Sequence, residues 1–182
     1  MFEKGKILHL NDQDLARLKD FILFGEKKFA FTALGKSMHP FFRSGDVIEI
    51  TAANFKDLKI GDVILFHIKE SNLAVHRVVN KILISNQLKL ITKGDFASAI
   101  DGAIGEANFI GKAVAVKNSA NWFIFKQLGL NKHWGPIIAK VSVLSGFLLS
   151  LLRRDKKSFY RNMLFYRVAK YTSSGIKQTK NE

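Results

Sequence analysis

The spacing of apolar residues near the start of the chain is helical. Within residues 12–27, apolar side chains recur every three or four positions, at Leu15, Leu18, Ile22 and Leu23. Asn11 or Asp12 can cap the first turn of such a helix. The pattern therefore predicts an N-terminal helical segment within residues 1–27.

From residue 28 onward the pattern is typical of β-strands. Short runs rich in β-branched and aromatic residues alternate with turn signals, among them three Gly-Asp pairs. The predicted strands cover residues 28–34, 46–52, 62–68, 73–84, 88–92 and 109–116. Six short strands at this spacing predict a mainly β, partly closed antiparallel domain over residues 28–117.

The remaining residues, 118–182, form a basic and apolar tail that is expected to be helical. Residues 134–152 contain one charge, Lys140, and the uncharged part is short for a membrane span. Phe159, Met163, Tyr166 and Arg167 favour a second, amphipathic helix. Three interpretations stay open: contact with a membrane surface, a span counted from Trp134, or soluble helices packed on the β domain.

The charge of the tail indicates the kind of partner that it binds, which its length does not. The net charge is +14 and the isoelectric point is about 10.0. Residues 1–117 are close to balanced, whereas the tail holds only two acids, Asp155 and Glu182. We expect an anionic membrane surface as the partner of residues 134–170, with nucleic acid less favoured. This predicts a membrane-associated protein, held peripherally or by one C-terminal anchor, and otherwise cytoplasmic; the N-terminus lacks the apolar core of a secretory signal.

Candidate chemistry appears in the stretch "ALGKSMHPFFRSGD", which holds Ser37 between a glycine and a proline. A serine that attacks a carbonyl needs a base within hydrogen-bond reach and donors for the oxyanion. His76, within a predicted strand, can be that base, and Asp95 or Asp101 can orient its ring. The residues alone equally allow a serine in a turn, a packed histidine and turn aspartates.

Other ionisable residues are weaker candidates. Lys93 could be the base of a Ser–Lys pair. His39 is expected at the exposed rim, and His67 is expected to be structural or on the surface. His9 and His133 are isolated in the sequence. No two histidines have a ligand spacing with a carboxylate, so neither a metal nor a cofactor is expected. The absence of cysteine excludes disulfides, thiolate nucleophiles and cysteine-ligated metal sites.

Five segments, in this order and spacing, resemble the type I signal peptidase family, which shares its fold with self-cleaving phage-type repressors. They are "GKSMHPFFRSGDVIEI", "IGDVILF", "AVHRVV", "TKGDFASAID" and "IGKAVAV", within about residues 29–117. The common bacterial branch has a lysine where this chain has His76, and the endoplasmic-reticulum and archaeal-like branch has histidine. The resemblance implies that Ser37 is the nucleophile, His76 the base, Asp101 its support and Asp95 a second acid.

The resemblance also implies an activity, a serine endopeptidase that cleaves after small residues in signal or leader segments. The substrate would be an extended polypeptide added to a strand edge. The backbone N–H of Ser37 is expected in the oxyanion hole, and Gly35 stands where some members carry an additional hydroxyl. Phe29, Phe31, Phe41 and Phe42 are expected either to wall shallow pockets or to fill the β core.

The chain departs from the family pattern because a polar helix, rather than a membrane anchor, is predicted before Ser37. Two other functions therefore stay open. One is a self-cleaving repressor-type regulator or a nucleic-acid-binding protein that uses the basic tail. The other is a catalytically inactive β module held by the tail.

Overall fold

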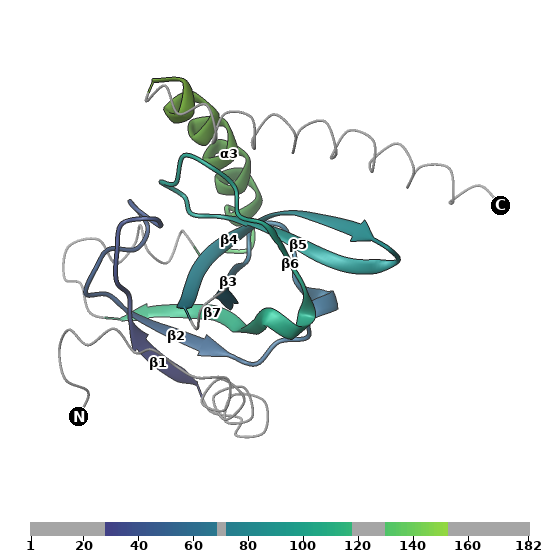
Figure 1. Ribbon diagram of the computed structural model, residues 1–182. Helices are drawn as coiled ribbons and strands as arrows, with labels where there is room; N and C mark the ends of the chain where they lie inside the picture. The colour runs from purple at the N-terminus through teal and green to yellow at the C-terminus, as the bar shows by residue number, and fades with distance from the viewer. Residues whose placement is uncertain (1–27, 69–71, 118–129, 153–182) are drawn as a thin grey trace.

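The computed structural model describes residues 28–68, 72–117 and 130–152 (Figure 1). The helix predicted over residues 12–27 and the amphipathic helix predicted around Phe159 lie outside the described residues.

The described chain is mainly one antiparallel sheet (Figure 1). Its strands are β1 (Phe29–Thr32), β2 (Val47–Thr51), β3 (Val63–Ile68), β4 (Asn72–Ile84), β5 (Gln87–Lys93), β6 (Ala103–Ile104) and β7 (Phe109–Lys117). Two short 3-10 helices, η1 (Phe55–Asp57) and η2 (Glu106–Asn108), interrupt the connections, and α3 (Gly135–Leu152) follows the sheet. All six predicted strands occur, and the two-residue strand β6 was not predicted.

The strand order is β1-β2-β7-β3-β4-β5-β6, and every neighbouring pair is antiparallel. The mainly antiparallel β fold is thereby confirmed. The sheet is not closed into a barrel, because β1 and β6 are its two ends. β7 lies between β2 and β3, so the last strand of the sheet joins two strands that are close in the sequence.

The β3 segment "VILF" is buried on both faces because the sheet has an apolar core on each side. Val63 and Leu65 belong to one core cluster, together with Met38 and Phe42 from the β1–β2 connection. Ile64 and Phe66 point to the opposite face and belong to a second cluster. Alternation along a strand sends successive side chains to opposite faces, so a strand between two cores reads as a continuous apolar run.

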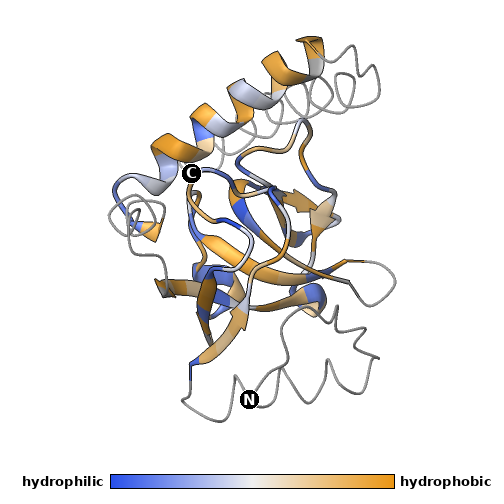
Figure 2. Cartoon of the chain, turned by 90° about the vertical axis from the view of Figure 1, so that its left-hand side faces the viewer, coloured by the Kyte–Doolittle hydropathy of each residue, from blue (hydrophilic) through white to orange (hydrophobic). Residues whose placement is uncertain are grey.

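Helix α3 covers a third cluster, formed with β4, β5 and the β5–β6 connection (Figures 1 and 2). Ala139 and Val143 of the helix pack there against Val79 and Ile91. The start of the helix touches the turn before β3, where a Cβ on Gly135 would lie 2.9 Å from the carbonyl oxygen of Gly61. Two glycines are needed for so close an approach of two backbones.

The outward face of α3 is largely apolar, and Figure 2 shows hydrophobic segments at intervals along the helix, between paler and hydrophilic ones. Its most exposed apolar residues recur at helical spacing: Ile137, Val141, Leu144, Leu148, Leu151 and Leu152. Within the described ranges, none of the helices has both the length and the apolar character needed to span a membrane.

Candidate active site

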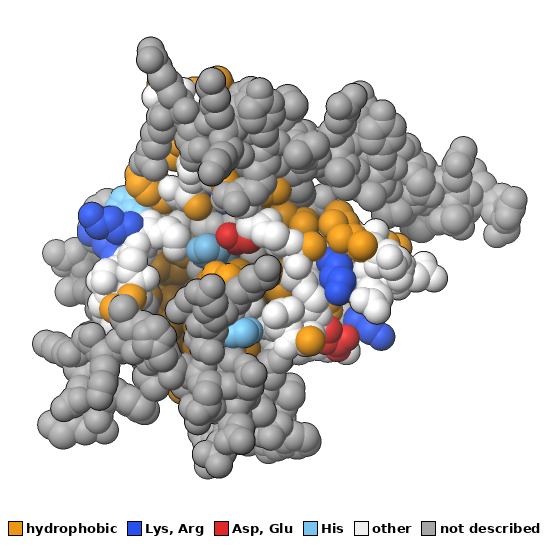
Figure 3. Space-filling model, in the orientation of Figure 1, with side chains coloured by type: hydrophobic (Ala, Val, Ile, Leu, Met, Phe, Trp, Pro, Cys, Tyr) orange, Lys and Arg blue, Asp and Glu red, His pale blue; other side chains and the backbone are white. Residues whose placement is uncertain are grey.

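Three segments far apart in the sequence bring a serine, a histidine and an aspartate into contact. Ser37 comes from the β1–β2 connection, His76 from β4 and Asp101 from the β5–β6 connection. The Oγ atom of Ser37 lies 3.0 Å from Nε2 of His76. Nδ1 of the same ring lies 2.6 Å from Oδ2 of Asp101. Histidine and acidic side chains reach the surface beside apolar ones on the face drawn in Figure 3.

The connection that carries Ser37 is closed at its base. The N–H of Ala33 donates to the carbonyl of Asp46 over 2.7 Å, and that of Gly45 donates back to the carbonyl of Ala33. Gly45 has a φ of +93°, in the left-handed region that favours glycine. Met38 and Phe42 then insert into the core. Ser37 is thus held on a loop that is anchored at its base and by its apolar side chains.

Gly94 brings the β5–β6 connection against the serine and the histidine. A Cβ at Gly94 would lie 2.7 Å from the carbonyl oxygen of Ser37 and 3.1 Å from Nε2 of His76. The N–H of Phe96 donates to the same carbonyl over 2.7 Å. Because no side chain fits at position 94 without displacing these atoms, the glycine permits the contact between the three segments.

The partners of His76 assign its protons. A carboxylate can only accept, so Nδ1 carries the proton that is donated to Asp101, and Nε2 can accept from the hydroxyl of Ser37. Asp101 in turn accepts from the hydroxyl of Thr92 over 2.8 Å. Thr92 was not predicted as a site residue; its only signal in the sequence is a hydroxyl at the end of a predicted strand.

Asp95 pairs with a different side chain, that of Arg77. Its two carboxylate oxygens accept from Nε and Nη2 of Arg77 at 2.9 and 2.6 Å, and both side chains are buried. Arg77 also donates to the carbonyl of Gly61 and lies over the ring of Phe41. Of the two acids that the sequence left open, Asp101 contacts His76, and Asp95 pairs with the arginine beside it.

Lys93, the alternative base, is fully buried. Its ammonium donates to the carbonyl of Gly94 over 2.9 Å and to the hydroxyl of Ser142, on α3, over 3.1 Å. Burial lowers the pKa of Lys93 to about 8, against the opposing attraction of Asp95 and Asp101. These hydrogen bonds are to neither the serine nor the histidine of the candidate site.

The remaining histidines lie apart from this arrangement. The ring of His39 meets that of Phe96 edge-on, at 5.8 Å between centroids. His67 has a buried Nε2 that finds no partner among the described residues, His133 is exposed, and His9 lies outside them. In the part of the chain that the structure describes, no three histidine or acidic side chains gather as metal ligands would.

The four phenylalanines all pack on the same core cluster. Phe42 is buried in the core, whereas Phe29, Phe31 and Phe41 are half-buried at the margin of the same cluster. Gly35 has a φ of +91°, where a residue with a side chain would be strained. The additional hydroxyl of some family members therefore has no easy place in this backbone.

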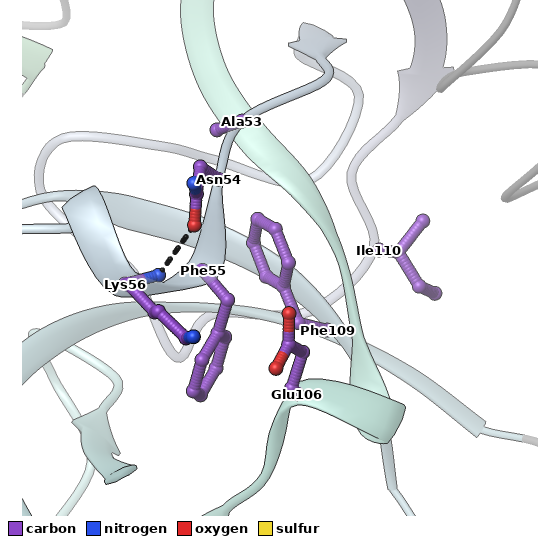
Figure 4. Close-up of a pocket in the computed structure, with 7 residues that line it drawn as sticks. All are labelled: Ala53, Asn54, Phe55, Lys56, Glu106, Phe109 and Ile110. Atoms are coloured by element: carbon purple, nitrogen blue, oxygen red, sulfur yellow. Dashed lines mark hydrogen bonds between the residues drawn. The ribbon is translucent and has the colours of Figure 1, made fainter.

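A separate hollow of about 360 Å³ opens between η1 and the start of β7 (Figure 4). Phe55 and Phe109 stack at a tilt inside it, with 5.7 Å between their ring centroids. Lys56 and Glu106 also line it. None of the predicted site residues belongs to this hollow.

The chain is similar to curated proteins named signal peptidase complex catalytic subunit SEC11. It is 36% identical over 70 residues to that of Metarhizium robertsii, 34% over 70 residues to that of Verticillium alfalfae and 33% over 70 residues to that of Pyricularia oryzae. Each match covers 37% of this chain and 41% of the relative, so the chain spans less than half the length of these relatives. No protein-family model matches the chain.

Proposed function

We propose that this chain, which is related to the endoplasmic-reticulum branch of the type I signal peptidase family, is a serine endopeptidase of the signal peptidase I type. Ser37 is the nucleophile, His76 the general base and Asp101 the residue that orients the imidazole. The observation that carries the proposal is the continuous hydrogen-bonded series from the Ser37 hydroxyl through both ring nitrogens of His76 to Asp101.

In the proposed reaction, Oγ of Ser37 attacks the carbonyl carbon of the scissile bond while its proton passes to Nε2 of His76. Asp101 stabilises the imidazolium that forms and keeps its Nδ1–H directed. The proton then passes to the leaving amine, which breaks the peptide bond and leaves an ester on Ser37. Water, deprotonated by the same nitrogen, hydrolyses this ester and regenerates the serine.

The oxyanion needs donors, and the backbone N–H of Ser37 is the proposed one. Within the described residues this N–H donates no hydrogen bond to any carbonyl or side chain, so it is available to a substrate oxygen. Removal of one oxyanion donor in other serine hydrolases costs about 2.7–4 kcal/mol of transition-state stabilisation.

The proposed substrate is an extended polypeptide with small side chains before the scissile bond. Residues 73–76 of β4 pair with β3 on one edge, whereas β5 joins the other edge only from Arg77, opposite Lys93. In the described parts of the chain, no strand occupies the second edge of residues 73–76. A peptide added there would run toward the Ser37–His76 pair. Half-buried Leu73 and Val75 offer it a shallow apolar wall.

An anionic membrane surface is the proposed second partner, through residues 134–170. The exposed apolar face of α3 supports this contact, since a helix that lies in the interface buries such a face among lipid chains. The proposed attachment is thus peripheral for the described part of the tail. The alternatives of a repressor-type regulator or a nucleic-acid-binding protein depend on residues that lie mostly outside the described ranges.

Cleavage of a peptide that contains an Ala-X-Ala motif tests the proposal, with fragments read by mass spectrometry. Ser37→Ala and His76→Ala are expected to lower the rate by roughly three orders of magnitude or more, and Asp101→Asn by a comparable factor, because the wrong tautomer then faces the serine. Ser44→Ala, an exposed serine of the same connection, should keep the wild-type rate.

The proposal fails if Ser37→Ala cleaves the peptide at the wild-type rate. If Ser37→Ala is inactive as expected, N-terminal sequencing of proteins from cells that express wild type or Ser37→Ala identifies natural substrates, as new N-termini that only the wild type produces.

A further inference from the structure

Lys93 places a buried positive charge directly before the glycine that contacts the candidate site. The side chain has no exposed surface, and its ammonium donates to two neutral oxygens, of Gly94 and Ser142. None of the ion pairs among the described residues includes it. A buried charge without a carboxylate in direct contact is costly, so packing alone does not account for a lysine at this position.

Helix α3 is shaped around this side chain. Gly146 faces Lys93 so closely that a Cβ there would collide with the Cε atom of the lysine and lie 3.1 Å from its Nζ. Ser142, one turn earlier, is buried and supplies the oxygen. Glycine is a poor helix former compared with alanine, and the close approach of the lysine explains the presence of glycine at position 146.

The other end of the connection reaches the catalytic pair. The carbonyl of Gly94 accepts from the Lys93 ammonium and from the N–H of Ala97. The α-carbon of Gly94 lies against Ser37 and His76, where a Cβ would not fit. A shift of the Gly94 peptide therefore changes the space around Oγ and Nε2.

We propose that Lys93 is a positioning residue, which ties helix α3 to the Gly94 peptide and thereby holds Ser37 and His76 at reacting distance. The inference rests on the proposed peptidase function. It concerns chemistry rather than substrate binding, because the Lys93 ammonium donates to Gly94 and Ser142 and not to residues 73–76, whose free edge is the proposed place of the peptide. Loss of the tie should therefore lower kcat and leave KM nearly unchanged.

The test compares full-length variants in the Ala-X-Ala cleavage assay. Lys93→Met removes the donor and keeps the length of the side chain, and Ser142→Ala removes only the acceptor on the helix. We expect kcat to fall by about ten- to a hundredfold in Lys93→Met, because small misplacements of reacting groups lower the rate by such factors. Ser142→Ala should lose roughly severalfold, with KM within about twofold of wild type in both.

Ser145→Ala is the matched control, since Ser145 lies on the same helix and donates to the carbonyl of Ser142 rather than to the lysine. It should keep the wild-type kcat. Thermal unfolding of every variant separates misplacement of the reacting groups from loss of folded protein. Lys93→Met removes a buried charge, so it should not unfold at a lower temperature than the control.

The proposal is overturned if Lys93→Met keeps the wild-type kcat, or if its loss of activity equals its loss of folded protein. Failure of the peptidase function has a different signature, since wild type and Ser37→Ala would then give the same cleavage.

Discussion

At Gly94, one added side-chain atom would disturb the geometry of the candidate site. A methyl group at this position would meet the carbonyl oxygen of Ser37 at 2.7 Å and Nε2 of His76 at 3.1 Å. We expect Gly94→Ala to lower kcat/KM by about a hundredfold or more, because the serine and the histidine must move apart.

Gly102→Ala is the control for this substitution. Gly102 belongs to the same β5–β6 connection, and a Cβ there would meet no atom within 4 Å. It should cleave the test peptide at nearly the wild-type rate. Equal activity of the two alanine variants would show that the close approach at Gly94 does not limit the reaction.

Lys93 also predicts how stability depends on pH. Its pKa is lowered from 10.5 to about 8 in the folded state, chiefly by burial. Below about pH 8 the lysine is charged in both states and the cost of burial is present in full. Between about pH 8 and 10.5 only the unfolded chain keeps the proton, so the free energy of unfolding rises with pH.

Urea denaturation of wild type and Lys93→Met at several pH values measures this effect. From pH 8 to 10.5 the free energy of unfolding of wild type should rise relative to that of Lys93→Met by up to about 3 kcal/mol. Lys59→Met, at an exposed position, controls for loss of a positive charge. Parallel curves for wild type and Lys93→Met would contradict the shifted pKa.

At the scale of elements, the Arg77–Asp95 pair joins β4 to the β5–β6 connection. Both side chains are buried, and the contact is bidentate. Asp95→Asn leaves the buried guanidinium without its carboxylate, and we expect it to lower the free energy of unfolding by roughly 3–5 kcal/mol. The double variant Arg77→Met, Asp95→Leu should recover much of that loss, as measured by denaturant unfolding.

Lys112→Met provides the comparison for a partly exposed pair, since Lys112 contacts Asp62 at 2.8 Å with a third of its side chain in solvent. Such pairs contribute about 1 kcal/mol or less. If Asp95→Asn proved as mild as Lys112→Met and instead abolished cleavage, Asp95 would act in the chemistry rather than in holding two elements together.

Elements were predictable from the sequence where the signal is local. The β3 run "VILF" and the Gly-Asp turns before β2 and β3 gave strand ends close to those observed. The two-residue strand β6 has no such signal, and it forms because Ile104 and Ala103 meet Leu90 and Ile91 of β5. The insertion of β7 between β2 and β3 likewise depends on contacts that no local pattern encodes.

The same limit applies to the candidate site. The residue types and the family resemblance pointed to Ser37, His76 and two acids, but could not distinguish Asp95 from Asp101. That distinction depends on Arg77. Strand alternation sends Arg77 to the opposite face of β4 from His76, and Asp95 meets the arginine there. Thr92 and Gly94 entered only through contacts made in three dimensions.

At the scale of the whole molecule, the sheet carries the candidate site and α3 carries an exposed apolar face. Leu144 and Leu148, one turn apart on that face, are 64% and 56% exposed. If the helix lies on a membrane surface, these side chains are among the lipid chains. Replacing both by glutamate then costs apolar burial and adds repulsion from anionic headgroups.

Flotation of the full-length chain with phosphatidylglycerol-containing vesicles measures this contact. We expect Leu144→Glu, Leu148→Glu to lose most of the floated protein. The matched control is Leu83→Glu, Ile84→Glu at the β4–β5 hairpin, where the two side chains are 58% and 45% exposed and distant in sequence from the helix. The control adds the same charge, so it should float like wild type if α3 makes the contact. Equal flotation of the two double variants would assign membrane binding to another part of the chain, and the apolar face of α3 would then need a different partner.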